Sequence, residues 1–267
     1  MGTLEGKIAI VTGASRGIGA QIARRLAAEG ATVAVTARTV EPDQSTLEGT
    51  ITQTVADIET AGGAAVAFAA DLSHAEDRER LISSVTEQLG PIDILVNNAA
   101  VTYFIPVEQF TLRRMNLMFE VQVNAPLHLA QLVVPAMKEN KGGTILNISS
   151  RAAIHPTLPP GANVGRGSTV YGMCKAALER FTTGLAAELY GDNIRVNALS
   201  PNRVVPTAGT IFHHLTTEDD PNAEPTTVMA EAALALCGGV QSEGSDPLTG
   251  RIAYSQDLLN ELGITLP

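Results

Sequence analysis

The chain has 267 residues, of which 45% are hydrophobic and 17% charged, a balance typical of a folded globular protein and unlike that of a disordered one. Its formal net charge of -10 argues against nucleic acid as a partner, because nucleic-acid-binding proteins usually present a basic face. No apolar run is long enough to cross a membrane, and the first residues do not form a secretory leader pattern. We therefore expect a cytoplasmic protein without a membrane partner, and its two cysteines, Cys174 and Cys237, fit a reducing compartment.

Short β-branched runs alternate with longer segments of helical period along the chain. The first strand is expected at residues 8–11, a helix at 17–29 and a second strand at 32–36. Further strands are expected at 66–70, 92–96, 144–148, 194–199 and 251–254. This alternation predicts an α/β fold with a Rossmann-like, doubly wound parallel sheet and helices on both faces. Since no linker or repeat divides the chain, residues 1–267 are expected to form a single domain.

Polar or turn-forming residues follow each of the first six predicted strands. In an open parallel sheet, ligands bind in the crevice beyond the carboxyl ends of the strands. The residues at these ends are Gly13, Arg38, Asp71, Asn97 and Asn98, Ser149 and Ser150, and Pro201 and Asn202. We expect them to line one continuous crevice.

A glycine-rich turn, TGASRGIG, occupies residues 12–19 between the first strand and the first helix. Backbone N–H groups and the helix dipole at such a corner can hold a pyrophosphate, and glycine allows the backbone to approach it closely. Glycine also serves ordinary strand-to-helix corners, so the position after the first strand is what favours a dinucleotide site. The expected contacts are Gly13, Ser15, Arg16, Gly17, Ile18 and Gly19.

The residues after the second strand bear on the choice of dinucleotide. An acidic residue there binds the ribose 2′-hydroxyl of NAD, whereas an arginine accommodates the 2′-phosphate of NADP. The sequence has Ala37 and Arg38 and no acid, and Arg16 could hold the same phosphate because guanidinium matches phosphate geometry. This pattern favours NADP(H) as the cofactor, while NAD(H) stays open. The simpler alternative is that both arginines are solvated surface charges without a role in binding the cofactor.

Tyr171 and Lys175 are four residues apart in a predicted helix, so their side chains project from one face. A free tyrosine has a pKa of about 10, and a nearby ammonium lowers that pKa and makes the phenol a better acid/base group. The same spacing also arises by chance on amphipathic helices. Ser150 ends the predicted strand at 144–148, where its hydroxyl can hydrogen-bond a carbonyl, and Ser149 should point to the opposite face.

These motifs and Asn124, which is unfavourable inside a helix, occur in the order seen in the short-chain dehydrogenase/reductase family of single-domain type. The chain resembles that family over residues 6–264, with a fainter likeness to its hydroxysteroid-dehydrogenase-like branch. The resemblance implies an NADP(H)-dependent oxidoreductase that interconverts a carbonyl and a secondary alcohol. Tyr171 would be the general acid/base and Ser150 would polarise the substrate oxygen. Lys175 would bind the nicotinamide ribose, and Asn124 would hold a water that links Lys175 to solvent.

The resemblance also implies further cofactor contacts. They are Asp71 and Leu72 at the adenine, Asn98 and Ala99 at the adenine ribose, and Pro201 and Thr207 near the nicotinamide. Asp71 could equally be an ordinary residue at the start of a helix. The sequence departs from the family pattern at Ala100 and Asn202, where glycine is usual, and Thr207 falls one residue late.

Two loops, at about 151–168 and 202–226, are expected to face a small-molecule carbonyl or alcohol substrate. The first could instead be a passive surface excursion, and the second resembles a mobile lid. His213 and His214 lack the companions of a metal site, so no metal is expected. The resemblance further implies a homo-oligomer, a dimer or tetramer, formed through the helices that carry Asn124 and Tyr171.

Two other functions compete with this interpretation. A nucleotide-sugar epimerase or dehydratase of the same fold usually has a shorter glycine spacing and a longer C-terminal substrate domain than this chain. A non-catalytic NADP-binding sensor or scaffold would have no need of a proton relay, so the presence of Asn124, Ser150, Tyr171 and Lys175 argues against it.

Overall fold

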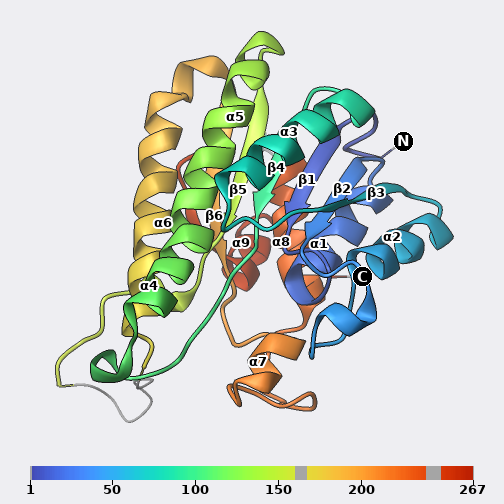
Figure 1. The fold of residues 1–267 in the computed structure, drawn as a ribbon. Helices are drawn as coiled ribbons and strands as arrows, with labels where there is room; N and C mark the ends of the chain where they lie inside the picture. The colour runs from blue at the N-terminus through green and yellow to red at the C-terminus, as the bar shows by residue number, and fades with distance from the viewer. Residues whose placement is uncertain (1, 160–166, 239–247, 267) are drawn as a thin grey trace.

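A computed structural model describes residues 2–159, 167–238 and 248–266. These residues contain seven strands in one parallel sheet, with the order β3-β2-β1-β4-β5-β6-β7 (Figure 1). The strands are β1 (Ile8–Thr12), β2 (Thr32–Ala37), β3 (Ala64–Ala69), β4 (Ile94–Asn97), β5 (Gly143–Ile148), β6 (Ile194–Ser200) and β7 (Ile252–Tyr254). Every predicted strand is present, and the start shifts by two residues at β3 and β4. The predicted Rossmann-like fold is therefore confirmed.

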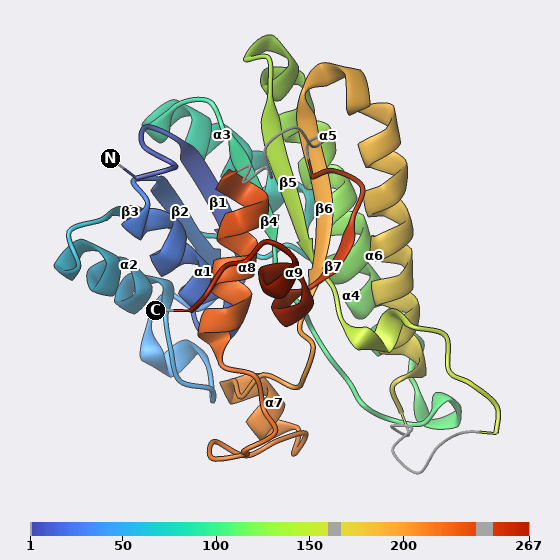
Figure 2. The ribbon, with the colours of Figure 1, turned by 180° about the vertical axis from the view of Figure 1, so that it is seen from behind.

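Helices cover both faces of the sheet (Figures 1 and 2). One face carries α1 (Gly17–Ala28), α2 (Ile51–Thr60), α8 (Thr226–Gly238) and α9 (Ser255–Glu261). The other carries α3 (Ala75–Leu89), α4 (Leu112–Phe119), α5 (Ala125–Glu139) and α6 (Thr169–Glu188). None of the helices in the described part of the chain has the length and apolar character needed to cross a membrane.

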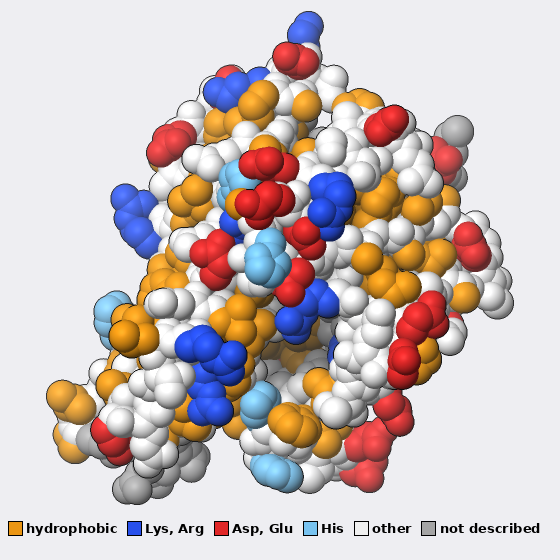
Figure 3. Space-filling view, in the orientation of Figure 1, with side chains coloured by type: hydrophobic (Ala, Val, Ile, Leu, Met, Phe, Trp, Pro, Cys, Tyr) orange, Lys and Arg blue, Asp and Glu red, His pale blue; other side chains and the backbone are white. Residues whose placement is uncertain are grey.

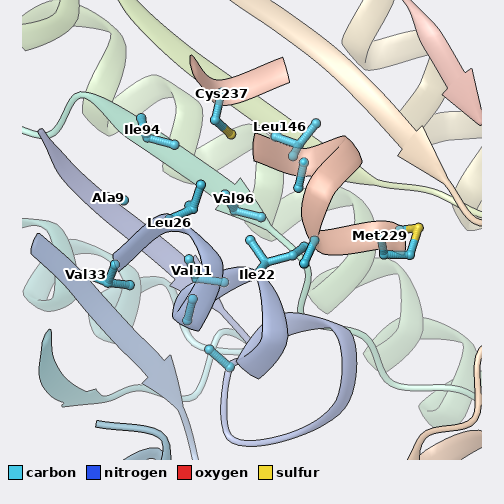
Figure 4. Packing of buried hydrophobic residues seen from close by; sticks show 14 of the residues in the cluster. Ala9, Val11, Ile22, Leu26, Val33, Ile94, Val96, Leu146, Met229 and Cys237 are labelled. Atoms are coloured by element: carbon cyan, nitrogen blue, oxygen red, sulfur yellow. The ribbon is translucent and has the colours of Figure 1, made fainter. Parts of the chain in front are cut away.

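Successive residues of each strand point to opposite faces and so enter two different cores. Ile10 packs with the α3 and α5 side, whereas its neighbours Ala9 and Val11 pack with the α1 and α8 side. Figure 4 shows the core on the α1 and α8 side, where Ile22 and Leu26 of α1 lie close to the strands. Burying each large side chain contributes roughly 1.5–3 kcal/mol, so the sheet forms a stable base for the residues at its carboxyl ends.

The switch in strand order lies at β1, which pairs with β2 on one side and β4 on the other. In doubly wound sheets the ligand crevice opens at this point. The short helix α7 (Ala208–Phe212) lies beyond the same end of the sheet, at the bottom of Figure 1. The expected lid region therefore contains a helix and is positioned over the crevice.

The connection between α4 and α5 is a π-helical turn, residues Glu120–Asn124. A π-turn adds a residue to the helix and changes which side chains face inward. Here Val121 and Gln122 are buried and Asn124 is exposed. The sequence predicts a regular helix through this segment, and the extra residue is the difference that matters for the site.

Candidate active site

The glycine turn holds its backbone in close contact with the segment after β4. Gly13 has a φ of +64°, and a Cβ there would lie 2.8 Å from the Cα of Ala99. A Cβ on Gly19 would lie 2.5 Å from the carbonyl oxygen of Gly13. The N-cap residue of α1 is Arg16, whose side chain has no oxygen to cap the first turn, so the N–H groups there suit an anion. The turn thus fits the pyrophosphate of a dinucleotide.

One cavity of about 770 Å³ runs along the carboxyl ends of the strands. Figure 3 shows its mouth as a hollow with basic and histidine side chains at the rim. Of the predicted site residues, all but Asn124 line this cavity. They are Gly13, Ser15, Arg16, Gly17, Ile18, Gly19, Arg38, Asp71, Leu72, Asn98, Ala99, Ser150, Tyr171, Lys175, Pro201 and Thr207. The cavity is large enough for a dinucleotide-type ligand and joins the glycine turn to the tyrosine and lysine of α6.

Asn98 braces the glycine turn. Its Nδ2 donates to the carbonyl oxygen of Thr12 at 2.9 Å and to that of Gly13 at 3.1 Å. The Thr12 hydroxyl in turn accepts the backbone N–H groups of Asn98 and Ala99. These bonds fix the turn against the end of β4, a role that the sequence alone did not indicate.

Two arginines meet at the end of the cavity nearest β2. Arg16 donates from Nη2 to the carbonyl oxygen of Gly49 at 2.9 Å and from Nη1 to the hydroxyl of Ser45 at 3.1 Å. Arg38 is exposed, and its Nη1 lies 3.8 Å from a carboxylate oxygen of Asp71. Burial and the nearby Arg38 charge lower the pKa of Arg16, since two like charges share this end of the site. An anion between them would relieve that repulsion.

The structure brings Tyr171, Ser150 and Lys175 together. The hydroxyl of Ser150 lies near that of Tyr171 and lowers the pKa of the phenol, against the effect of burial. The Nζ of Lys175 lies 5.7 Å from the Tyr171 ring centroid and donates to the carbonyl oxygen of Ile148 at 2.8 Å. A hydroxyl pair with a buried ammonium beside it can pass a proton to or from an oxygen placed at Ser150.

The pKa shifts of this group differ from the sequence-based expectation. Desolvation raises the pKa of Tyr171, and the hydrogen bond from Ser150 opposes that rise. Burial lowers the pKa of Lys175 to about 8. The sequence predicts a lowered pKa for Tyr171, whereas here burial of the phenol dominates and the net effect is a raised pKa.

Asn124 is the one predicted site residue that does not line the cavity, and its role in holding a water beside Lys175 stays a prediction. Its side chain is exposed, and Nδ2 donates to Glu120 Oε2 at 2.7 Å. The π-turn instead places Gln122 inside, with 1% of its surface exposed. Its Nε2 donates to the carbonyl oxygen of Val101 at 2.9 Å, and within the described residues its buried Oε1 has no partner.

Glu179 extends the line of Tyr171 and Lys175 by a further turn of α6 and was missed in the sequence. Its Oε1 accepts a hydrogen bond from the hydroxyl of Ser149 at 2.6 Å. Ser149 and Ser150, adjacent in sequence, therefore have different partners. Burial raises the pKa of Glu179, and the charge of Lys175 opposes that rise. The spacing of eight residues from Tyr171 was the available signal.

The segment after β4 and the lid region meet over Tyr171. The Phe104 ring centroid lies 5.4 Å from that of Tyr171 and 5.4 Å from that of His213. His213, which follows α7, also shares a hydrogen bond of 3.2 Å with the hydroxyl of Thr102. These contacts form a wall that sequence spacing did not predict. Of the other expected loop, 151–168, residues 160–166 lie outside the described residues.

A doubly wound sheet with a glycine turn at its switch point, and a tyrosine and a lysine on one helix facing the same cavity, defines a dinucleotide-binding oxidoreductase. The model of the short chain dehydrogenase family matches residues 7–213, and the chain belongs to this family of NAD(P)-dependent oxidoreductases.

The chain is similar to proteins and structures of this family. It is 38% identical over 205 residues to a short chain dehydrogenase of Pseudocercospora fijiensis, a match that covers 76% of this chain and 61% of that protein. A metagenomic short-chain oxidoreductase solved with NADP has a TM-score of 0.75 and 30% identity, covering 94% of this chain and 98% of that one. A 7α-hydroxysteroid dehydrogenase solved with NADH and 7-oxoglycochenodeoxycholic acid has a TM-score of 0.77 and 30% identity, covering 94% of this chain and 93% of that one.

Proposed function

We propose that this protein interconverts a carbonyl and a secondary alcohol by hydride transfer, with NADP(H) as cofactor. The observation that carries the proposal is the hydroxyl pair of Ser150 and Tyr171 in the cavity that begins at the glycine turn. A bound nicotinamide would supply or accept the hydride. The residues of the chain would then position the reacting oxygen and move the proton.

In the reductive direction, the Ser150 hydroxyl binds the substrate oxygen and Tyr171 donates the proton to it. The raised pKa of Tyr171 keeps the phenol protonated and ready to donate at neutral pH. Lys175, buried and cationic, stabilises the tyrosinate that remains and holds the nicotinamide ribose. Oxidation of the alcohol runs through the same groups in reverse, with the tyrosinate as base.

The preference for NADP(H) is supported by the charge at the β2 end of the cavity. Arg38 is exposed there and only loosely paired with Asp71, and Ala37 supplies no acid to bind a ribose 2′-hydroxyl. Arg16 is already bonded to Ser45 and Gly49, so it fixes the loop around the phosphate while Arg38 provides the more available charge.

We also propose that residues 1–267 act as one dinucleotide-binding and catalytic unit in the cytoplasm, with the loops 151–168 and 202–226 facing the substrate. Copies of the chain would associate through α5 and α6, on which Leu127 and Met173 are exposed.

The test is the Tyr171→Phe variant, assayed with NADPH against a panel of ketones and aldehydes and with NADP+ against alcohols. We expect turnover to fall by about a thousandfold or more, while the Kd for NADPH changes by less than about threefold, since proton transfer is lost and binding is kept. A Tyr190→Phe variant serves as the control, because Tyr190 is exposed and does not line the cavity. Near-normal kcat in Tyr171→Phe would overturn the mechanism.

A further inference from the structure

We infer that the carbonyl substrate carries an anionic group, which Arg151 and Arg203 bind at the end of the cavity opposite Arg38. This inference deepens the proposed function and rests on it. It follows from the distribution of charge, because the cavity is basic although the chain as a whole is acidic.

The chain has 18 lysines and arginines against 28 aspartates and glutamates. The described residues that line the cavity reverse this balance: five are basic and one is acidic. The basic residues are Arg16, Arg38, Arg151, Lys175 and Arg203, and the acidic one is Asp71. A cavity with this excess of positive charge attracts anions and raises their local concentration.

A phosphorylated dinucleotide accounts for part of this charge. Arg16 and Arg38 lie together beside β2, where Asp71 is also found. Lys175 is buried against Ile148 and belongs to the proton relay. Arg151 and Arg203 come from other segments, after β5 and after β6, and are not explained by either group.

Arg151 immediately follows Ser150, the residue expected to touch the reacting oxygen. Its guanidinium carbon lies 5.7 Å from the ring centroid of Tyr254, and no carboxylate of the described residues lies within 4.0 Å of it. Arg151 is exposed and is one of the residues that line the cavity. An exposed guanidinium resting on an aromatic face can bind a carboxylate with two parallel hydrogen bonds.

Arg203 has one acidic neighbour, Glu224, which is already engaged. The carboxylate of Glu224 is buried and accepts hydrogen bonds from the hydroxyl of Ser255 and the backbone N–H of Asn202. Burial raises the pKa of Glu224, and Arg203 opposes that rise through its charge, which places its guanidinium within electrostatic reach of the buried carboxylate. Its guanidinium makes no ion pair within the described residues and is exposed, so it remains able to bind an anion.

Apolar and aromatic side chains also line the cavity. Phe104 packs edge-on against Tyr171, and Val204 and Leu215 line the same cavity. A substrate that satisfies both features has an apolar body next to the carbonyl and a negative charge at its far end. The geometry therefore points to keto acids in preference to neutral ketones.

The test uses matched pairs of aryl ketones, 3-benzoylpropionate and 4-benzoylbutyrate, with the methyl ester of each. Binding is measured by calorimetry to the Tyr171→Phe variant loaded with NADP+, and turnover is measured on the wild type with NADPH. We expect at least one acid to bind about tenfold or more tightly than its ester, because a charge-assisted bond to guanidinium is lost in the ester. Raising the ionic strength should reduce this preference.

Arg151→Gln and Arg203→Gln should each reduce the preference for the acid, and the double variant should abolish it. Arg113→Gln is the matched control, because Arg113 is exposed on α4 and does not line the cavity. Equal binding of acids and esters, or an acid preference that survives the double variant, would overturn the inference. In that case, turnover of the esters would still support the proposed function. Preferential binding of an acid that depends on both arginines, without turnover of any carbonyl, would instead contradict the proposed function alone.

Discussion

Lys175 reaches from α6 to the end of β5 and donates from Nζ to the carbonyl oxygen of Ile148 at 2.8 Å. This bond ties the helix that carries Tyr171 to the strand that leads to Ser150. It also holds an ammonium in a site where only 3% of the residue's surface is exposed. The proposed proton relay therefore contains a buried charge, which is unfavourable for stability and useful for catalysis.

Replacing Lys175 with methionine should stabilise the protein and abolish turnover. The pKa of Lys175 is about 8 in the folded chain, below the value of about 10.4 expected in the unfolded chain. The folded state is therefore penalised below pH 8, by roughly 3 kcal/mol, of which the lost bond to Ile148 offsets a part. We expect Lys175→Met to raise the free energy of unfolding by about 1 kcal/mol at pH 7.

The sign of this effect should depend on pH. Between pH 8 and pH 10 the unfolded chain binds more protons at Lys175 than the folded chain does, so the wild type gains stability as pH rises and the variant does not. Urea unfolding of both proteins at pH 7 and pH 9.5 checks this. A stability difference that is the same at both pH values would contradict the account of the buried charge.

Arg38→Leu should weaken NADPH binding selectively. Arg38 is the exposed cation beside Ala37, so removing it should raise the Kd for NADPH by about tenfold to a hundredfold, with little change for NADH, which lacks the 2′-phosphate. Fluorescence titration of both cofactors measures this. Arg24→Leu, which removes an arginine paired with Asp57 away from the cavity, is the control. Equal losses for NADPH and NADH would show that Arg38 does not read the 2′-phosphate.

Gln122 and Asn124 should respond differently to substitution. Gln122→Met fills the same space but leaves the carbonyl oxygen of Val101 without its donor, which loosens the segment that leads to Phe104. We expect kcat/KM to fall about tenfold in Gln122→Met and to change by less than about twofold in Asn124→Ala, whose side chain only bonds Glu120. The reverse order of effects in steady-state assays would show that the Asn124 side chain takes part in the relay.

Gln122 and Asn124 illustrate which features of the fold and the site the sequence predicts and which it does not. Strand and helix alternation predicted the sheet because buried parallel strands read as short β-branched runs, and polar residues at strand ends predicted the cavity lining. The outward orientation of the Asn124 side chain could not be predicted, because a π-turn shifts the phase of the helix and no periodicity in the sequence signals that extra residue.

Contacts between segments that are distant in the sequence could not be predicted either. The hydroxyls of Ser149 and Thr102 find their partners in Glu179, 30 residues away, and in His213, 111 residues away. Such pairs depend on how α6 and the lid region pack, which a single sequence does not specify. Arg16 was placed correctly at the cavity, but its bonds to Ser45 and Gly49 arise from a loop whose path only the structure gives.

Glu179→Gln should shift the alkaline limb of the pH profile to lower pH. The negative charge of Glu179 supports the protonated form of Lys175 and raises its pKa against the effect of burial. Glutamine keeps an acceptor for the Ser149 hydroxyl but removes the charge, so the pKa of Lys175 should fall further below about 8. Because the relay needs the ammonium, kcat/KM for reduction should decline at a pH lower by about half a unit or more than in the wild type. Glu188→Gln makes the same change at an exposed position on α6 and should leave the pH profile unchanged. An unshifted profile in Glu179→Gln, or an equal shift in both variants, would show that Glu179 does not set the pKa of Lys175.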